Sequence, residues 1–225
     1  MKLENYGYYV LKELKQLLQS ETFCTLIDNY ELDAAYQYVI EHSRYDNICG
    51  GLTELLQTTL EIDPLDYLTT VPKTYTAYNK SVTEVILPPQ IEEIGDFAFA
   101  ECWNLVSVKI NDGCKRIGKH AFQGCEKLTS IVLPSSLKRI ECGAFLASGL
   151  TNIVIPDSVT YLGDDAFNFC TELRTAEMSS NISSILDHTF SWSDALEEII
   201  VPPHLKEYVE ELQLPENTKI IEKWP

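Results

Sequence analysis

The chain has 225 residues, a hydrophobic fraction of 45% and a formal net charge of −17 that arises from 17 basic and 34 acidic residues. The hydrophobic fraction is sufficient for a substantial buried core and excludes a disordered chain. The negative charge repels the phosphates of nucleic acids and anionic membrane surfaces, so we expect no direct nucleic-acid or membrane partner.

The beginning of the chain, Met1 to Val10, does not have the composition of a secretory signal. It contains no apolar run and no small-residue cleavage site, and no stretch of about 18 consecutive apolar residues occurs anywhere in the sequence. The seven cysteines are an odd number, which favours a reducing compartment. We therefore expect a cytoplasmic protein; a secreted or surface protein is expected only if a signal has been removed.

Residues 3 to about 60 carry apolar residues at helical spacing in three segments. The spacing predicts helices over Leu3–Leu18, Leu32–Ile40 and Ile48–Leu60. Asp28 or Asn29 is the expected N-cap of the second helix. A proline-containing stretch, residues 63–80, leads from these helices into the rest of the chain.

Two roles fit this helical segment. It can close the first coil of the repeats that follow, because the end of a repeat array must not expose its core. It can also be a separate interaction or effector domain, because it is rich in tyrosine, which supplies apolar area with a polar tip at interfaces. The tyrosines are Tyr6, Tyr8, Tyr9, Tyr30, Tyr36, Tyr38 and Tyr45.

An Ala-Phe pair then recurs, with threonine in place of alanine in the last copy. Successive phenylalanines are separated by 23, 23, 22 and 23 residues. The leucine that follows each phenylalanine comes one residue early after the third, which places a one-residue deletion near residues 147–149. Such a regular period predicts a repeat architecture. The phenylalanines are Phe99, Phe122, Phe145, Phe167 and Phe190.

Each repeat contains two short segments with a buried face. In the first, two apolar residues flank one outward residue, and proline follows in four of the repeats. The second is an apolar pair separated by two residues, followed in three repeats by a glycine that permits a sharp turn. The inward pairs of the first segment are Val85/Leu87, Val108/Ile110, Ile131/Leu133, Ile153/Ile155, Ala176/Met178 and Ile199/Val201.

The repeat can be written L-x-x-V-x-I-P-x-S-V-x-x-I-G-x-x-A-F-x-x-C-x-x-L, and the copy from Leu150 to Cys170 follows it most closely. This motif resembles the BspA-like leucine-rich repeat family over about residues 82–205. The resemblance implies a right-handed leucine-rich-repeat solenoid of short β-strands. Members of this family are typically bacterial or protist proteins, often on cell surfaces, that bind other proteins. The resemblance therefore also implies that this chain binds another protein. The copy from Arg174 to Leu196 departs from the motif, with Met178-Ser179 in place of Ile-Pro.

The expected fold class is therefore α+β, a solenoid preceded by an α-helical cap domain. We divide the chain into residues 1–80, the helical cap or interaction domain with its linker; residues 81–205, the repeats; and residues 206–225, a C-terminal cap. The C-terminal part is expected to contain a helix-like segment, Tyr208–Leu212, and the apolar pair Ile220-Ile221.

The residue between each inward pair is expected to point outward, because side chains alternate along a strand. Successive coils lie about 4.8 Å apart, so these residues form a continuous stripe. The stripe is apolar except at two positions, and exposed apolar patches usually mark interaction sites. Alternatively, the branched residues only favour strand formation, or the chain's own loops cover them. The members of the stripe are Ile86, Lys109, Val132, Val154, Glu177 and Ile200.

Two consecutive Lys-Arg pairs occupy the second segment in adjacent coils. Stacked like charges cost stability unless acidic residues pair with them. Either nearby acids neutralise the cations, or the cations form a small site for an anion or an acidic partner. The pairs are Lys115-Arg116 and Lys138-Arg139, and the acids close in register are Glu92, Glu93 and Glu141.

Residue patterns for catalysis or metal binding are weak. His120 and His188 occupy the same repeat position three coils apart, roughly 14 Å, which is too far for one metal ion. The cysteines that follow the anchor phenylalanines fit a buried apolar position. Cys49 lies outside the repeats and is a weak candidate nucleophile without a partner histidine. We expect no cofactor and no metal.

The leading functional hypothesis is a non-catalytic protein-binding scaffold that uses the outward face of the repeats. The alternative is an acidic inhibitor or decoy that blocks a nucleic-acid-binding protein by mimicking its polyanion. A third hypothesis, an enzyme, depends on Cys49 alone.

Overall fold

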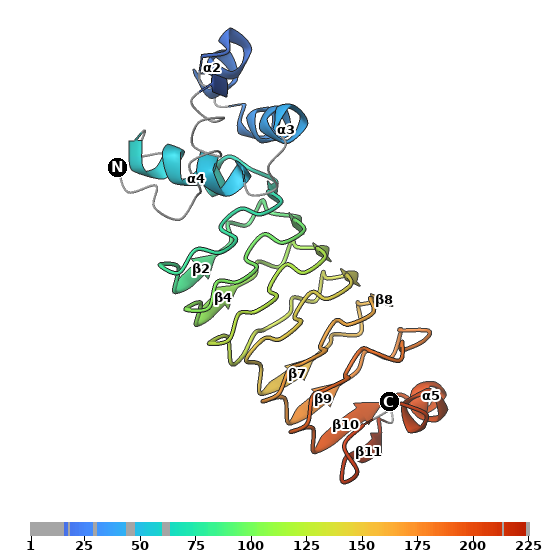
Figure 1. Cartoon of the computed structure of the whole chain (residues 1–225). Coiled ribbons are helices and arrows are strands. Elements are labelled where there is room, and N and C mark those ends of the chain that lie inside the picture. The colour runs from blue at the N-terminus through green and yellow to red at the C-terminus, as the bar shows by residue number, and fades with distance from the viewer. Residues whose placement is uncertain are drawn as a thin grey trace.

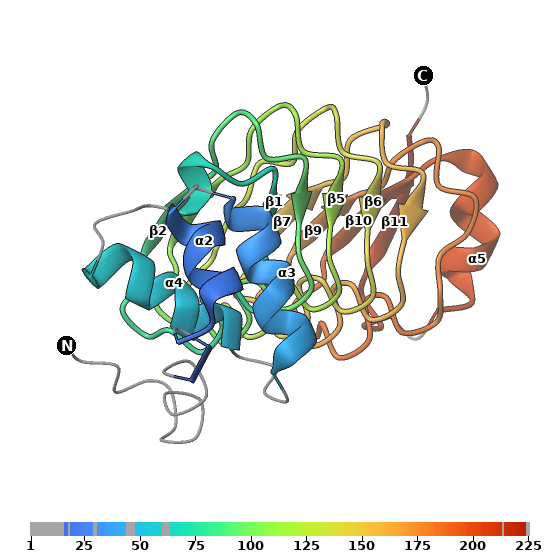
Figure 2. The ribbon, with the colours of Figure 1, turned by 90° about the horizontal axis from the view of Figure 1, so that it is seen from above.

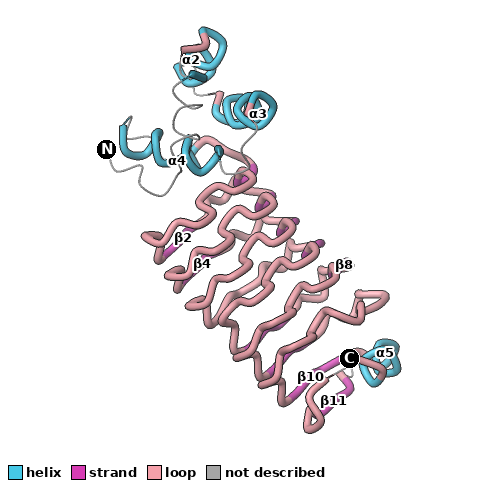
Figure 3. Tube along the Cα trace, viewed as in Figure 1, coloured by secondary structure: helices cyan, strands magenta, loops and turns pink. Residues whose placement is uncertain are grey.

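The computed structural model describes residues 16–17, 19–28, 31–43, 48–59, 64–212 and 214–223. Three helices, α2 (Glu21–Asp28), α3 (Leu32–His42) and α4 (Ile48–Thr59), come first. A solenoid of short strands and turns follows, with the helix α5 (Lys206–Glu210) near its other end (Figure 1). Most of each coil is turn or loop (Figure 3).

The second and third predicted helices are confirmed as α3 and α4. The first predicted helix, Leu3–Leu18, lies almost wholly outside the described residues. Helix α2 was not predicted, and Asp28 is its last residue. The expected N-cap of α3 was wrong, because Glu31 precedes that helix and makes no side-chain capping hydrogen bond.

One side of the solenoid is built from parallel strands, each next to the strand of the following coil. They form a two-stranded sheet, β2-β4, and a four-stranded sheet, β7-β9-β10-β11. Between the two sheets, a single bridge joins Lys109 to Val132. The strands are β2 (Glu84–Ile86), β4 (Ser107–Lys109), β7 (Asn152–Val154), β9 (Thr175–Glu177), β10 (Glu198–Val201) and β11 (Lys219–Glu222).

A second column of two-residue strands forms a five-stranded parallel sheet on another side. The corresponding segment of the degenerate repeat, Ile182–Ile185, forms no strand, although both isoleucines are buried. The strands are β1 (Thr70–Val71), β3 (Glu93–Ile94), β5 (Arg116–Ile117), β6 (Arg139–Ile140) and β8 (Tyr161–Leu162).

Strand β1 lies in the stretch that we expected to be a linker. It pairs with β3, and beyond it Thr74 N donates to Asp96 O at 3.0 Å and Thr76 N to Ala98 O at 2.8 Å. Residues 70–78 therefore form an additional coil. The motif did not reveal this coil because its Ala-Phe position has been replaced by Thr and Tyr residues. The division at residues 80 and 205 and the right-handed winding stay predictions.

The five anchor phenylalanines form a stack through the core. Their ring centroids are 5.3, 5.3, 5.4 and 5.6 Å apart in chain order, and adjacent planes lie within 9° of each other. Each ring is at most 1% exposed. Backbone hydrogen bonds accompany the stack, with Phe99 N donating to Ala121 O at 2.8 Å and Phe145 N to Ala166 O at 2.9 Å. Apolar burial and hydrogen bonding thus fix the same coil register.

The cysteine of the motif is a donor as well as a buried apolar residue. Cys125 Sγ donates to the carbonyl of Phe99 at 3.3 Å, and Cys170 Sγ to that of Phe145 at 3.1 Å. In the last coil Ser193 Oγ replaces the thiol and donates to Phe167 O at 2.9 Å. The side chain therefore satisfies a buried carbonyl of the preceding coil, which would otherwise carry a desolvation cost.

The helices share buried surface with the first coils. Phe23, Leu52 and Val71 belong to one continuous cluster of buried side chains. Tyr36 and Thr53 join α3 to α4 through a 2.6 Å hydrogen bond between their hydroxyl oxygens. The three helices gather at one end of the solenoid, and α5 lies at the opposite end (Figure 2).

The outer ends of the coils turn sharply through residues with positive φ. One such set, which we call the turn column, lies two residues after each anchor phenylalanine and at the equivalent place in the first coil. Left-handed backbone is rare for residues with a Cβ, so the packed coils on both sides must hold it in place. The turn column is Tyr78, Glu101, Gly124, Ala147, Phe169 and Trp192.

The shorter, 22-residue coil requires a glycine at its turn. Gly149 N donates to Cys125 O at 3.1 Å, so the two backbones are close. A Cβ at Gly149 would overlap the carbonyl oxygen of Glu126. The one-residue deletion in this coil therefore requires glycine at position 149.

We predict that Gly149→Ala lowers the free energy of unfolding by about 1–3 kcal/mol, because backbone atoms must move to admit the methyl group. Urea denaturation measures this loss. The control is Ala147→Gly, two residues away at a φ of 53°, where glycine is favoured and no loss is expected. Equal stability of Gly149→Ala and the wild type would contradict the close approach.

Candidate functional site

The predicted outward stripe is brought together on the side formed by β2, β4, β7, β9, β10 and β11, which we call the larger strand face. Val132 is 83% exposed, Ile86 61% and Val154 59%, and Lys109 is also exposed. Glu177 and Ile200 are half-buried. The strand register places these residues in one row: Ile86 beside Lys109, Lys109 beside Val132, Val154 beside Glu177, and Glu177 beside Ile200.

The row continues to the end of the described chain. Ile200 is the register partner of Ile221 in β11, which is 38% exposed. Lys223, just beyond β11, lies 2.8 Å from Glu177 and 3.5 Å from Asp157 between its Nζ and their carboxylate oxygens. The ion pair with Lys223 neutralises Glu177, the acidic member of the row. Lys109 remains an exposed cation within the row.

A shallow groove opens where the two sheets are interrupted. Its volume is about 540 Å³, and it lies between residues 106–110 and 129–132. The coil that holds Val132 is followed by the 22-residue coil, and Val132 has one bridge in place of a full strand. The groove therefore adds depth beside the most exposed apolar residue of the row.

Val106, which is 53% exposed and lines this groove, was not predicted from the sequence. It stands just before β4, outside the alternating segment on which the stripe was based. A signal was present, because the equivalent positions hold threonine, arginine or glutamate. Polar residues at this position in the other coils indicate that the position faces solvent. A valine there is therefore an exposed apolar side chain.

The cations of the second sheet are mostly paired with carboxylates. Arg116 contacts Asp96 at 2.9 Å, Glu141 at 3.3 Å and Glu93 at 3.7 Å, in each case between a guanidinium nitrogen and a carboxylate oxygen. Partial burial lowers the pKa of Arg116, but the hydrogen bonds and charges of Asp96 and Glu141 outweigh burial and raise it. A guanidinium so enclosed is a structural cation.

Glu141 links both arginines, because its carboxylate also accepts from Arg139 Nε at 2.9 Å. Lys115 pairs with Glu92 at 2.7 Å on the surface. Lys138 is exposed, and no ion pair joins it to the described part of the chain. Three of the four cations that the sequence singled out are therefore paired with acids close in register. The pairs are Lys115 with Glu92, Arg116 with Glu93 and Glu141, and Arg139 with Glu141. Asp96 was not anticipated because it comes from the turn after β3.

Cys49, on which the enzyme hypothesis depended, is 1% exposed and burial raises the pKa of its thiol to about 12. It therefore remains protonated at neutral pH and is a poor nucleophile. His120 stacks on Phe97 with ring centroids 4.9 Å apart, as part of the coil packing. Within residues that the structure describes, no three His, Cys, Asp or Glu side chains come together as a metal site. None of the described helices combines the length and apolar character needed to cross a membrane.

The sequence matches the family described as BspA type leucine rich repeat region, in six copies over residues 69–197. No curated protein matches it. The first copy begins at β1, in agreement with the additional coil.

Solved structures of bacterial leucine-rich repeat proteins have a similar fold. A leucine-rich repeat protein from Bacteroides ovatus is 31% identical with a TM-score of 0.63, over 71% of this chain and 42% of that one. The T. pallidum leucine-rich repeat protein is 26% identical with a TM-score of 0.56, over 70% and 81% of the two chains. The pneumococcal vaccine antigen PcpA, 23% identical with a TM-score of 0.53 over 70% and 45%, shows likeness of fold alone. The chain spans less than half of the Bacteroides ovatus protein.

We predict that Glu141→Ala lowers the free energy of unfolding by about 1–3 kcal/mol, because it leaves two arginines without their shared, mostly buried carboxylate. Glu92→Ala is the matched control, since its ion pair with Lys115 is more than half exposed on both sides. Its loss should stay below about 1 kcal/mol. Urea denaturation of both variants measures the difference, and equal losses would contradict the structural role of Glu141.

Proposed function

Because the chain belongs to the BspA-type leucine-rich repeat family, we propose that it is a non-catalytic scaffold that binds another protein through the outward row of its larger strand face. Leucine-rich repeat proteins generally act as protein-interaction scaffolds. The observation that carries the proposal is the exposure of Val132, Val154 and Ile86 in one row.

Physical chemistry favours this row as the contact surface. A valine side chain gains about 1.5 kcal/mol or more when it is fully removed from water, so covering several of these residues supplies substantial binding energy. The groove beside Val132, with Val106 on its wall, offers a recess for an apolar side chain of the partner. Lys109, between Ile86 and Val132 in the row, adds a charge that can select an acidic group.

We also propose that helices α2 to α4 close the first coil of the solenoid. The support is the burial of Leu68 and Val71 at its start and of Leu52 in α4. A hydrogen bond of 2.8 Å from Gln90 Nε2 to Leu65 O ties the connection to the second coil. An end of the solenoid covered in this way keeps apolar surface from water.

We predict that Val132→Arg abolishes or strongly weakens capture of the partner, since it places a charge in an apolar contact. The experiment compares wild-type and variant proteins as baits in a native lysate, with mass spectrometry of what each retains. Stability should change by less than about 0.5 kcal/mol, because the side chain is almost fully exposed. Ser135→Arg, an exposed residue after the strand segment, is the control for the added charge. Retention of the same proteins by all three baits would contradict the proposal.

Salt dependence of the captured complex separates this scaffold from the acidic decoy. Apolar contacts change little with ionic strength, whereas a polyanion mimic loses affinity steeply. We expect the complex to persist in elution series of rising salt. Release at moderate salt, together with normal capture by Val132→Arg, would favour the decoy.

A further inference from the structure

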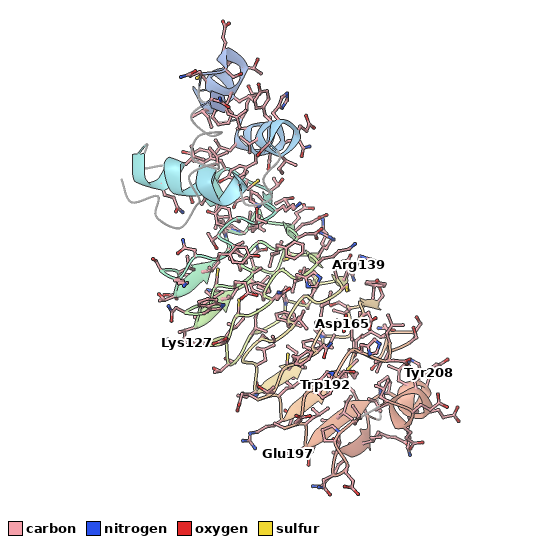
Figure 4. The ribbon with its side chains drawn as sticks, viewed as in Figure 1. Lys127, Arg139, Asp165, Trp192, Glu197 and Tyr208 are labelled. Atoms are coloured by element: carbon pink, nitrogen blue, oxygen red, sulfur yellow. The ribbon has the colours of Figure 1, made fainter. Side chains whose placement is uncertain are left out.

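Two aromatic rings stand exposed at the outer turns of the solenoid, away from the strand row. Phe169 and Trp192, adjacent members of the turn column, are 47% and 64% exposed. Their rings stack with centroids 5.8 Å apart and planes 13° from parallel. Figure 4 labels Trp192 on the ribbon. Exposed apolar side chains in contact with each other mark an interaction surface.

Elsewhere in the solenoid a cation from the preceding coil covers an exposed aromatic ring. The guanidinium of Arg139 lies 3.9 Å from the ring centroid of Tyr161, and the ammonium of Lys80 lies 4.4 Å from that of Trp103. Arg139 precedes Tyr161 by 22 residues and Lys80 precedes Trp103 by 23, so each cation occupies the equivalent position one coil earlier. Cations at these distances are attracted by the ring faces.

At Phe169 the equivalent residue is Ala147, 22 positions earlier, and it is exposed. Alanine neither covers the ring nor carries a charge. Among the described residues no cation stands over Phe169, and Trp192 of the following coil stacks on that ring. The ring thus keeps one face that its own coil neighbours do not cover.

A carboxylate lies on the other side of Ala147. The side chain of Glu101 covers Gly124, where an added Cβ would come within 2.8 Å of both carboxylate oxygens. Trp103 Nε1 donates to this carboxylate at 2.7 Å and Gln123 Nε2 at 3.1 Å, which hold it in place. Gly124 and Phe169 are two coils apart, roughly 10 Å by strand spacing. A guanidinium stacked on the ring lies too far from this carboxylate for a hydrogen bond, so the carboxylate attracts it through its charge.

We propose that the exposed face of Phe169 over Ala147 binds an arginine side chain of a partner protein. A guanidinium stacks on an aromatic ring with its planar face, which an ammonium does less well, and the charge of the Glu101 carboxylate adds attraction from two coils away. The arrangement reproduces between molecules what Arg139 and Tyr161 do within this one. The site is separate from the strand row and does not depend on the function proposed for it.

The charge of the surroundings fits a basic partner. The whole chain carries a net charge of −17. Glu126, Glu172 and Asp194 follow members of the turn column by two or three residues and are exposed. The basic residues at the same spacing are Lys127, whose ammonium donates to Asn104 Oδ1 at 2.7 Å, and Lys80, whose ammonium lies over the Trp103 ring. A basic segment is therefore drawn to this side of the solenoid.

The test uses the full chain and a short fluorescein-labelled peptide of alternating glycine and arginine, with fluorescence anisotropy at physiological ionic strength. A second peptide carries citrulline, the neutral isostere, in place of every arginine. Replacing arginine by citrulline, or Phe169 by alanine, should each raise Kd by about two- to thirtyfold. Tyr208→Ala removes an exposed aromatic ring on α5 and should leave Kd unchanged.

A second variant fills the site from within. Ala147→Arg places a guanidinium where Arg139 stands relative to Tyr161, so it should weaken binding of the arginine peptide as Phe169→Ala does. Ala147→Ser is the control, because its small uncharged side chain leaves the space over Phe169 open, and this variant should bind like the wild type. Equal Kd values for the wild type, Phe169→Ala and Ala147→Arg would overturn the proposal. Binding of a neutral oligosaccharide that Phe169→Ala abolishes, without preference for arginine over citrulline, would also overturn it in favour of a carbohydrate site.

Discussion

The stack of five phenylalanine rings is the constraint on which the rest of the solenoid depends. Each coil places one ring on that of the preceding coil, at 5.3 to 5.6 Å, inside a shell of backbone hydrogen bonds between the same coils. Contact between the rings fixes how a coil is rotated about the solenoid axis, and the hydrogen bonds fix its spacing from the next coil along that axis. A residue's position within its coil therefore determines its row on the surface.

The rows differ in how far side chains of neighbouring coils pair with or cover one another. In the second sheet, Glu141 pairs with Arg116 and Arg139 of adjacent strands, so the charges are compensated within the molecule. In the outward row of the larger strand face, Val132 lies beside Lys109 and Val154 beside Glu177, and both valines stay exposed. The surface left unsatisfied by the chain itself is the surface that a partner can stabilise.

The 23-residue period predicted much of this arrangement, because a period translates directly into rows. The outward position of Val132 and the pairing of the cations with Glu141 followed from register alone. The first coil did not follow from the anchor spacing, since Thr76 and its neighbours replace the Ala-Phe pair; the family match from residue 69 and the pairing of β1 with β3 reveal it. Neither was the left-handed backbone at Phe169, because non-glycine residues adopt it only when adjacent coils enforce it. The interruption of the sheet near Val132, in the coil before the shortened one, was likewise not predicted.

The unfolding of Phe145→Ala tests most directly whether ring stacking holds the coils in register. Phe145 lies at the centre of the stack, with a ring on each side. We expect the free energy of unfolding in urea to fall by about 3–5 kcal/mol, the usual cost of removing a buried phenylalanine ring. A loss below about 1 kcal/mol would contradict this expectation and would show that the hydrogen bonds between coils suffice without the stack.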